Sequence, residues 1–450
     1  MSIPIRDERK EILDRDAEVL SKTSLLKKVL CNNAIFSSSV KPLNRGYAEG
    51  FGKSRLSIVK VEYAYNGELP NRFLLKIYGW QNKTSIDEEF EREFKFYELF
   101  PTNLTYELGG EKIRPIPKVY SLDRTNSREY IEKKAFLMDL LSEQTLRTYM
   151  MDLIKNKSEN SRDYLIYRSL KPLVVIHDNL ATDLYRDSMQ DNLAIESNPN
   201  DYAQRLSTSL RKIVYFTTPS GLGKDQFKKA EEMPEASDVI GEDIATGGNL
   251  KRIINGELYP HNHLVDTIID WGTVAIGPLT LDIGYLFGSF PFDSQDITSA
   301  IDIYTDLSTS KNLNKKELER KTRLTSIFAR LEATYQTIET LVGVYQSNEK
   351  INNNFAQEEF INKLIHGEQL GMAGNITRAK EEIGILLKRR RELEVSSKLE
   401  KALKTIQSYL QIETSEEQGK FFEIDFFGLS FRISSKSNKK KKPRDLVKVR

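Results

Sequence analysis

The stretch NGELYPHNHLVDTIIDWG, residues Asn255–Gly272, determines which fold the whole chain is expected to have. It presents a carboxylate, an amide and a carboxylate in that order, at Glu257, Asn262 and Asp270. Oxygen ligands of this kind, on a loop and at a strand end, can hold Mg²⁺ against the phosphates of a nucleotide. Such a site also needs a lysine and a loop that covers the phosphates, and both would have to come from elsewhere in the chain.

The composition is that of an ordinary globular protein. Its 450 residues are 39% apolar and 29% charged, and this length allows two or three domains with a large core. The formal charge is +2, but residues 436–450 hold eight Lys/Arg and one Asp. The basic character therefore belongs to a C-terminal tail that we expect to be disordered. No stacking aromatics are interleaved with its basic residues, so only weak contact with nucleic acid is expected.

The cysteine and histidine content excludes several kinds of site. Cys31 is the only cysteine, so no intrachain disulfide can form and a cytoplasmic setting is favoured. The N-terminal segment has no apolar run of signal-peptide length, and no later run is long enough to span a membrane. Four histidines and one cysteine lack the paired ligands of structural zinc sites. We expect a cytoplasmic protein without a membrane partner.

Strand patterns precede the opening stretch. Leu56–Tyr65 and Asn71–Trp80 are rich in β-branched and aromatic residues, and the strong turn signal Asn66-Gly67 lies between them. Another pair of strands is expected at Lys118–Thr125 and Lys133–Leu141, joined by a turn at NSRE. These segments predict a small antiparallel sheet.

The same region supplies candidates for the phosphate loop and the lysine. Lys76 lies in the second strand, and the amphipathic helix expected at residues 85–100 carries Glu93 beside its apolar face. A strand lysine paired with a helix glutamate is the ion pair that nucleotide kinases use to hold the α- and β-phosphates. Spacing alone leaves Glu89, Glu91 and Glu98 as competitors, and only the motif selects Glu93. Spaced glycines that let main-chain N–H groups approach phosphate precede the first strand, at Gly46, Gly50 and Gly52.

The rest of the chain is mainly helical in pattern. A change to helical periodicity near Ser142 marks a hinge, residues 228–250 are expected to form a loop, and residues 295–412 contain no proline. Phe421–Ile433 resembles a hairpin. The expected domains are a helical extension (1–40), a nucleotide-binding N-lobe (41–140), a helical C-lobe (141–412, with the catalytic loop at 252–287), and a hairpin with a basic tail (413–450).

In this order, the parts resemble the aminoglycoside phosphotransferase and choline kinase superfamily. Its motif reads roughly His-Gly-Asp-Leu-His-Pro-Gly-Asn-Ile-Leu, then Ile-Asp-Trp or Ile-Asp-Phe, then Gly-Asp-Pro and Asp-Leu-Ala. The chain matches this motif at Gly256, Leu258, Pro260, Asn262, Leu264, Asp270, Trp271, Gly277 and Asp282. The resemblance implies an α+β, bilobal protein-kinase-like fold. In that fold the N-lobe is a small antiparallel sheet with one helix, and the larger C-lobe is mainly helical, here with extra C-terminal helices.

The resemblance also implies cofactors and roles. ATP or another nucleoside triphosphate, with Mg²⁺, would transfer phosphate to a hydroxyl of a small-molecule acceptor. Asn262 and Asp270 would bind the metal, and Glu257 would accept or orient the proton of the hydroxyl. Asp282 would brace the catalytic loop. The nucleotide would be held by Gly46, Gly50 and Gly52 over its phosphates, by Lys76 with Glu93, and by the main chain near Leu137, Met138 and Asp139 at its base.

The match has two departures from the motif. Asn255-Gly256-Glu257 replaces His-Gly-Asp, and the extra methylene of glutamate displaces its carboxylate by about an ångström, which can cost about 10²-fold in rate. A catalytically impaired, pseudokinase-like nucleotide-binding protein is therefore the alternative function. Asn262 and Asp270 are also only eight residues apart, so a tight turn at Asp266-Thr267 would have to bring them together.

A second register of the catalytic pair stays open. Asp243 and Asn249 could take the places of Glu257 and Asn262, with a longer interval before Asp270 but without the Leu-x-Pro pattern. The histidines are expected to have other roles, namely packing of His263 in the hairpin, a loop position for His261, and a core hydrogen bond for His177.

Overall fold

The computed structural model describes residues 5–42, 54–64, 70–79, 83–100, 105–108, 110–140, 145–156, 161–188, 198–217, 224–246, 248–289, 291–310, 313–348, 374–410, 421–426 and 429–434. The chain divides into two compact units. The first comprises Met1–Glu196, Arg252–Gly277 and Asp306–Lys311, and the second comprises Ser197–Lys251, Pro278–Thr305 and Asn312–Arg450. Lys76, Glu93, Glu257, Asn262 and Asp270 all belong to the first unit. The lobe limits expected from the sequence stay a prediction.

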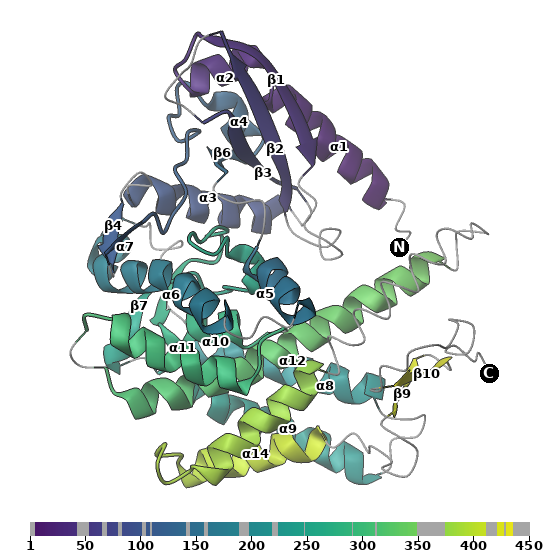
Figure 1. Ribbon diagram of the computed structural model, residues 1–450. Coiled ribbons are helices and arrows are strands. Elements are labelled where there is room, and N and C mark those ends of the chain that lie inside the picture. Colours follow the sequence, from purple (N-terminus) through teal and green to yellow (C-terminus); the bar gives the residue numbers. More distant parts are fainter. Residues whose placement is uncertain are drawn as a thin grey trace. The chain divides into compact units, whose positions relative to one another are not determined.

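The first unit contains a four-stranded antiparallel sheet with the order β1-β2-β3-β6 (Figure 1). Lys76 on β3 stands opposite Leu56 on β2 and Phe136 on β6. The two strands predicted around the Asn66-Gly67 turn are therefore confirmed as β2 and β3, while the turn itself lies outside the described residues. The strand bounds are β1 Ile35–Pro42, β2 Ser54–Tyr63, β3 Arg72–Tyr78 and β6 Ala135–Asp139.

The two faces of this sheet are covered by different helices. Alternate residues of a strand point to opposite faces, so Leu75 and Ile77 enter one core and Lys76 and Tyr78 face the other way. The first face packs against helices α1 (Ile5–Leu20), α2 (Thr23–Val29) and α4 (Arg128–Glu132), which Figure 1 shows beside the strands. The second face meets helix α3 (Lys83–Leu99), through rings such as Phe90 stacked on Phe136. Lys76 is thereby brought to the helix that carries Glu93.

Two expectations for this region are wrong. β1 begins within the predicted helical extension, and its Ser37-Ser38-Ser39 run has little strand propensity of its own, so the ladder to β2 supports it. Lys118–Thr125 does not form a strand and contributes one bridge, between Val119 and Met138. The Asp123 carboxylate instead accepts from the Thr125 N–H at 2.9 Å, which makes a local turn that leads into α4.

The remainder of the first unit surrounds the opening stretch. Strands β7 (Lys251–Ile254) and β8 (Ala275–Pro278) pair with each other and bracket it in the sequence. The other elements are β4 (Tyr106–Leu108), β5 (Glu111–Ile113), α5 (Leu146–Lys155), α6 (Arg162–Asn179) and α7 (Thr182–Ser188). The main-chain N–H of Leu146 at the start of α5 donates to the His263 oxygen at 2.7 Å, so α5 is fastened to the stretch.

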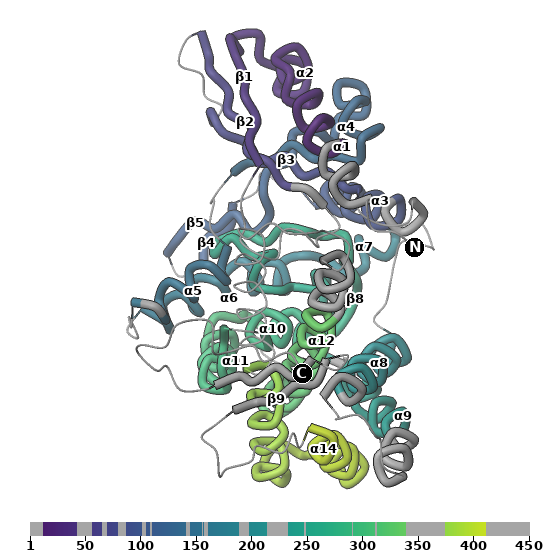
Figure 2. The backbone as a smooth tube through the Cα atoms, turned by 90° about the vertical axis from the view of Figure 1, so that its right-hand side faces the viewer, coloured from purple at the N-terminus to yellow at the C-terminus, as the bar shows by residue number. Residues whose placement is uncertain are grey.

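The second unit is mainly helical. Figure 2 shows α8 beside α9 and α14 beside α9. The loop expected at 228–250 is wrong, because α9 continues to Ala245 and buries Met233 and Ile240. Gly241 belongs to a close helix contact, since a Cβ there would lie 2.7 Å from the Pro199 oxygen of α8. The helices are α8 (Pro199–Thr217), α9 (Lys224–Ala245), α10 (Thr280–Phe287), α11 (Ser294–Leu307), α12 (Lys315–Asn348), 374–388 and α14 (Ser397–Tyr409).

The small antiparallel sheet and the mainly helical remainder confirm the predicted α+β fold class, although α1, α2, α3 and α4 pack against the sheet where one helix was expected. The predicted C-terminal hairpin is confirmed as β9 (Phe421–Phe426) and β10 (Leu429–Ser434), and the basic tail after it lies outside the described residues. Within the described ranges, no helix is both long enough and apolar enough to cross a lipid bilayer.

Candidate phosphotransfer site

Gly256 and Asn255 shape the loop after β7. Gly256 has φ +87°, and a Cβ there would lie 2.5 Å from the Thr273 oxygen, so only glycine fits this turn. Thr273 Oγ1 donates to the Asn255 oxygen at 2.9 Å, and Asn255 Nδ2 donates to the main-chain oxygen of Asp270 at 2.8 Å. Asn255, which the sequence comparison treated as a departure, therefore positions the metal-ligand candidate.

Asn262 lies in a short 3₁₀ turn, Pro260–Asn262, with its amide directed by the loop. Its main-chain N–H donates to the Tyr259 oxygen at 2.8 Å, and its Nδ2 donates to the Glu257 oxygen at 3.4 Å. Because the amide nitrogen faces the loop main chain, the amide oxygen is the end that can act as a ligand. Glu257 is half-buried at the start of the same loop.

A tight hairpin carries the chain from Asn262 to Asp270. His263 bridges Ile268, the Leu264 N–H donates to the Thr267 oxygen at 2.8 Å, and Val265 adopts φ +63° at the tip. The Ile269 N–H donates to the Asn262 oxygen at 3.0 Å. Asn262 therefore neighbours the residue before Asp270 across the hairpin. The turn expected at Asp266-Thr267 is present, and it returns the main chain to the side of Asn262 within eight residues, while the joint role of Asn262 and Asp270 as metal ligands stays a prediction.

His263 is a core residue of this hairpin. It is fully buried, and Nε2 lies 2.8 Å from the Ser169 oxygen. Burial lowers the pKa of His263 to about 4, so the ring is neutral near pH 7. His261 is half-buried in the loop and stacks on Tyr259, with 5.5 Å between ring centres. Across the described ranges, no three His, Cys, Asp or Glu side chains gather as a metal cluster.

Lys76 lies between two carboxylates. Its Nζ is 2.6 Å from Glu93 Oε2 and 2.6 Å from Asp270 Oδ1. The Lys76 and Glu93 side chains are 3% and 0% exposed, whereas that of Asp270 is 38% exposed. Of the four candidate glutamates, Glu93 is the buried one and forms the ion pair with Lys76, whereas Glu89 and Glu91 are half-buried and Glu98 is exposed.

The two carboxylates decide the charge of this lysine. Burial by itself lowers the pKa of Lys76, but Asp270 and then Glu93 raise it, and the net direction is upward. The ammonium is therefore charged at neutral pH. A fixed positive charge beside a partly exposed carboxylate is the arrangement needed to hold phosphate oxygens next to a metal ion.

Several residues of this site were not predicted from the sequence. Glu93 Oε1 accepts from Tyr97 Oη at 2.9 Å and from the Trp271 N–H at 3.1 Å, and Tyr78 donates to Oε2. Arg92 donates to the Gly272 oxygen at 2.8 Å. The only sequence signal was spacing, because Tyr97 follows Glu93 by one helical turn and Tyr78 shares a strand face with Lys76.

The main-chain groups that were expected to bind the nucleotide base already form hydrogen bonds within the protein. The Asp139 N–H donates to the Lys118 oxygen at 2.9 Å, and its carboxylate is held by Arg114 and by Tyr120. The Leu137 oxygen accepts from the Tyr120 N–H at 2.8 Å. A base could use these groups only by displacing present bonds, so the roles of Met138 and Asp139 stay a prediction. Gly46, Gly50 and Gly52 lie outside the described residues.

Asp243 and Asp282 both belong to the second unit. Asp243 near the end of α9 forms ion pairs with Arg320 and Lys321, 3.4 Å and 3.3 Å long, and Asn249 lies in the 3₁₀ turn Gly248–Leu250. These partners give Asp243 a structural role, which favours the register based on Glu257. Asp282 is fully buried in α10, and its bracing role stays a prediction.

Neither a family model nor a curated protein matches this sequence. Solved structures do resemble it. Choline kinase from Cryptosporidium parvum shares 12% identity over 87% of this chain and 99% of that chain, with a TM-score of 0.44. Ethanolamine kinase from Plasmodium vivax shares 12% over 82% and 93%, with a TM-score of 0.42. A thermostable mutant of an aminoglycoside phosphotransferase shares 11% over 80% and 97%, with a TM-score of 0.40. These are the kinds of kinase that the sequence motifs resemble.

The donor set of the hairpin suits Mg²⁺. This ion prefers oxygen ligands and is usually bound by one or two carboxylates together with substrate phosphates. The Asp270 carboxylate is partly exposed. The Asn262 amide nitrogen donates to the Glu257 oxygen, so its amide oxygen is the end that can bind a metal. Two oxygen donors on the two arms of one hairpin would fit an ion that completes its shell with phosphate and water.

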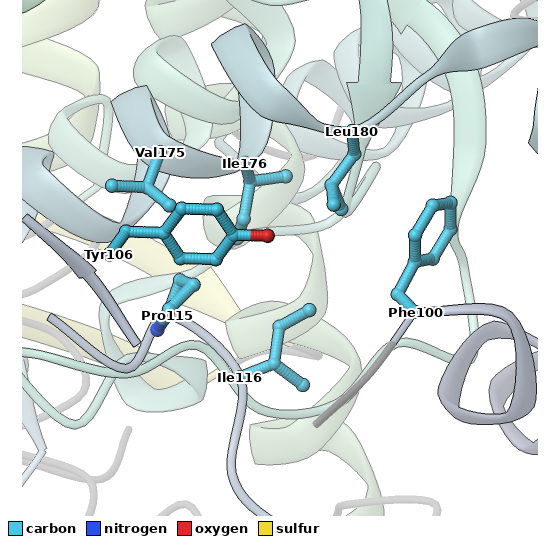
Figure 3. A pocket seen from close by; sticks show the side chains of 7 residues that line it. All are labelled: Phe100, Tyr106, Pro115, Ile116, Val175, Ile176 and Leu180. Atoms are coloured by element: carbon cyan, nitrogen blue, oxygen red, sulfur yellow. The ribbon is translucent and has the colours of Figure 1, made fainter. Parts of the chain in front are cut away.

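A small apolar pocket of the same unit has a different character. Figure 3 shows the side chains that line it, and the Tyr106 hydroxyl is the one polar group at their ends. None of the candidate site residues lines this pocket, so it supplies no chemistry to the site. The lining residues are Phe100, Tyr106, Pro115, Ile116, Val175, Ile176 and Leu180.

Proposed function

We propose that this protein is an ATP- and Mg²⁺-dependent phosphotransferase that moves the γ-phosphate to a hydroxyl of a small molecule. The observation that carries the proposal is the ion-paired group in which Lys76 contacts both the buried Glu93 and the partly exposed Asp270. Lys76 would hold the α- and β-phosphates, while Asn262 and Asp270 would hold the metal. Bound Mg²⁺ would neutralise phosphate charge. Lys76 is charged and held at 2.6 Å from each carboxylate, so it would need little reorganisation to bind the phosphates.

Glu257 is the proposed acceptor of the hydroxyl proton. Its main-chain oxygen accepts from the Tyr259 N–H at 2.8 Å and from Asn262 Nδ2, so the loop at this residue is held in place on both sides. The carboxylate would take the proton of the acceptor hydroxyl. At the same time the hydroxyl oxygen would bond to the γ-phosphorus, and the bond from that phosphorus to the leaving nucleoside diphosphate would break. The left-handed φ of Gly256 determines the direction of the main chain from which the Glu257 side chain, longer than the aspartate of the motif, extends.

Glutamate in place of aspartate also favours a second candidate function. A pseudokinase-like protein would keep the nucleotide-binding group of Lys76, Asn262 and Asp270 but would not transfer phosphate, because Glu257 would miss the hydroxyl. The two candidates share nucleotide binding and differ only in turnover. An assay that separates binding from turnover therefore distinguishes them.

Thermal unfolding with and without ATP and Mg²⁺ tests the shared part. We expect a Mg²⁺-dependent rise of Tm that Asp270→Ala abolishes, since ligands that bind only the folded state stabilise it. The matched control is Asp266→Ala, which removes a carboxylate of the same hairpin that pairs with Arg168 on the surface. Asp266→Ala should keep the rise. An unchanged Tm of the parent protein on adding ATP and Mg²⁺ would contradict the proposal.

Turnover is measured on a panel of alcohols, sugars and amino alcohols by following release of ADP and the phosphorylated product. Phosphorylation of any of them by the parent protein, lost in Glu257→Gln, supports the phosphotransferase. Nucleotide binding without product on the whole panel supports the pseudokinase. Glu257→Asp adds a test of geometry: it shortens the side chain to the superfamily's aspartate, so activity should persist or rise.

A further inference from the structure

The hydroxyl of Tyr78 is inserted into the Lys76–Glu93 ion pair. Tyr78 follows Lys76 by two residues on β3, so both side chains leave the same face of the sheet. The hydroxyl accepts from Lys76 Nζ at 3.0 Å and donates to Glu93 Oε2. The ammonium also lies 4.5 Å from the centre of the Tyr78 ring, a cation–π distance. Tyr78 therefore contacts the lysine through both its hydroxyl and its ring.

The hydrogen bonds of Lys76 account for all of its donors. A lysine ammonium has three N–H groups, and these reach Glu93 at 2.6 Å, Tyr78 at 3.0 Å and Asp270 at 2.6 Å. Glu93 and Tyr78 are buried, whereas the Asp270 side chain is 38% exposed. Two donors are thus held inside the protein and one is directed to the accessible side.

We propose that Tyr78 is a positioning residue for the nucleotide, an inference that rests on the proposed function. Together with Glu93, its hydroxyl holds two donors of Lys76 so that the third is aimed at the phosphates of a nucleoside triphosphate. Asp270 is the acceptor that a phosphate oxygen replaces. The bonds to Glu93 and Tyr78 remain when this exchange takes place, so the ammonium does not move away as its third partner changes.

The packing around Tyr78 leaves room for this hydroxyl and fixes the ring. A Cβ at Gly272 would lie 2.9 Å from Tyr78 Oη, so the glycine after Trp271 keeps the space open. The ring makes edge contacts with Phe90 and Phe136, at 6.0 Å and 6.4 Å between centres. These contacts hold the ring against the stacked pair of Phe90 and Phe136, and its hydroxyl is directed to the ion pair.

Tyr78→Phe removes the hydroxyl and keeps the ring, so its effect isolates the proposed bond. We expect Kd for a non-hydrolysable ATP analogue with Mg²⁺, measured by calorimetry, to rise about tenfold, the size of one hydrogen bond to a charged group. The matched control is Tyr130→Phe. Tyr130 is also fully buried, and its hydroxyl donates to the Leu20 oxygen at 2.6 Å in the core on the other face of the sheet. The control should change Kd by less than about twofold.

Two results would overturn the inference: unchanged affinity in Tyr78→Phe, or an equal loss in Tyr130→Phe. A double-mutant cycle with Lys76→Met adds a readout that a structural role would not move. If Tyr78 acts through Lys76, removing its hydroxyl in the Lys76→Met background should cause no further loss of affinity, whereas a persisting tenfold loss would contradict the inference. Should Lys76→Met not fold, the comparison of Tyr78→Phe with Tyr130→Phe decides alone.

The two proposals fail in different ways. Absence of nucleotide binding by the parent protein would refute the proposed function. In that case the Tyr78–Lys76 contact is tested by urea unfolding of Tyr78→Phe, of Lys76→Met and of the double variant that carries both changes. Non-additive losses of stability would support the bond between these side chains, and additive losses would contradict it.

Discussion

Replacing Glu93 with glutamine tests whether one buried carboxylate organises the candidate site. Glu93 Oε2 accepts from Lys76 and Tyr78, and Oε1 accepts from Tyr97 and from the Trp271 N–H. Glutamine keeps the size of the side chain and one acceptor oxygen. Its NH₂ group, however, must face two of the four donors, so two hydrogen bonds are lost whichever way the amide turns.

The size of the effect follows from these contacts. Breaking a buried ion pair by removing one partner costs about 3–5 kcal/mol. Two lost hydrogen bonds to a charged group, at about 1.5–3 kcal/mol each, give a similar total. Asp270 still contacts Lys76 at 2.6 Å in the variant, so the ammonium keeps one carboxylate. We therefore expect the lower end of the range, a loss of about 3 kcal/mol.

Urea unfolding followed by circular dichroism measures this loss as a lower midpoint at unchanged slope. The matched control is Glu98→Gln on the same helix, where the carboxylate is exposed and pairs with Lys95 at 2.7 Å. A surface pair of this kind contributes about 0–1 kcal/mol, so the control should lie close to the parent protein. A Glu93→Gln variant within about 1 kcal/mol of the parent would refute the reasoning, because that is the value of a surface group.

Two further predictions concern the hairpin and its loop. Gly256→Ala should destabilise the protein by about 1–3 kcal/mol and more than Gly110→Ala, measured by urea unfolding, because both glycines have positive φ but only Gly256 meets the Thr273 oxygen. Equal losses would contradict the clash. Burial lowers the pKa of His263 from 6.5 to about 4, so the unfolded chain takes up the proton first and stability falls as pH decreases from 6.5 to 4, by about 3 kcal/mol in all. Unfolding at several pH values should show a flatter pH dependence for His263→Asn, and an unchanged slope would contradict the assignment.

The strand pair β2 and β3 could be predicted because its signal is local. Runs of β-branched and aromatic residues on either side of Asn66-Gly67 indicate a hairpin without help from the rest of the chain. α9 has the opposite character. Its Gly241 is a loop residue by propensity, but α8 approaches so closely that a Cβ would lie 2.7 Å from the Pro199 oxygen. Contacts between helices of this kind are absent from a local pattern, and they override propensity.

The candidate site divides in the same way. A motif was enough to name Lys76 and Glu93, which the structure brings to 2.6 Å of each other. By the motif, Asn255 is only a departure from the expected histidine, because a motif compares residue types rather than contacts. In the structure this asparagine donates to the main chain of Asp270 at 2.8 Å, across fifteen residues of sequence. Such a bond depends on how the hairpin folds back, which spacing alone does not specify.

Glu93 connects the lysine that is proposed to bind phosphate with the hairpin that is proposed to bind the metal. One carboxylate oxygen binds Lys76, and the other binds the N–H of Trp271, the residue directly after Asp270. The Trp271 ring stacks on Phe96 of α3 with 4.2 Å between centres, so the same helix holds the hairpin end by a second contact. Asp270 adopts φ +67°, a left-handed conformation that costs a non-glycine residue about 1–3 kcal/mol. The bonds to Trp271 and from Asn255 offset that cost. They hold the main chain at Asp270, whose carboxylate contacts Lys76 and is 38% exposed.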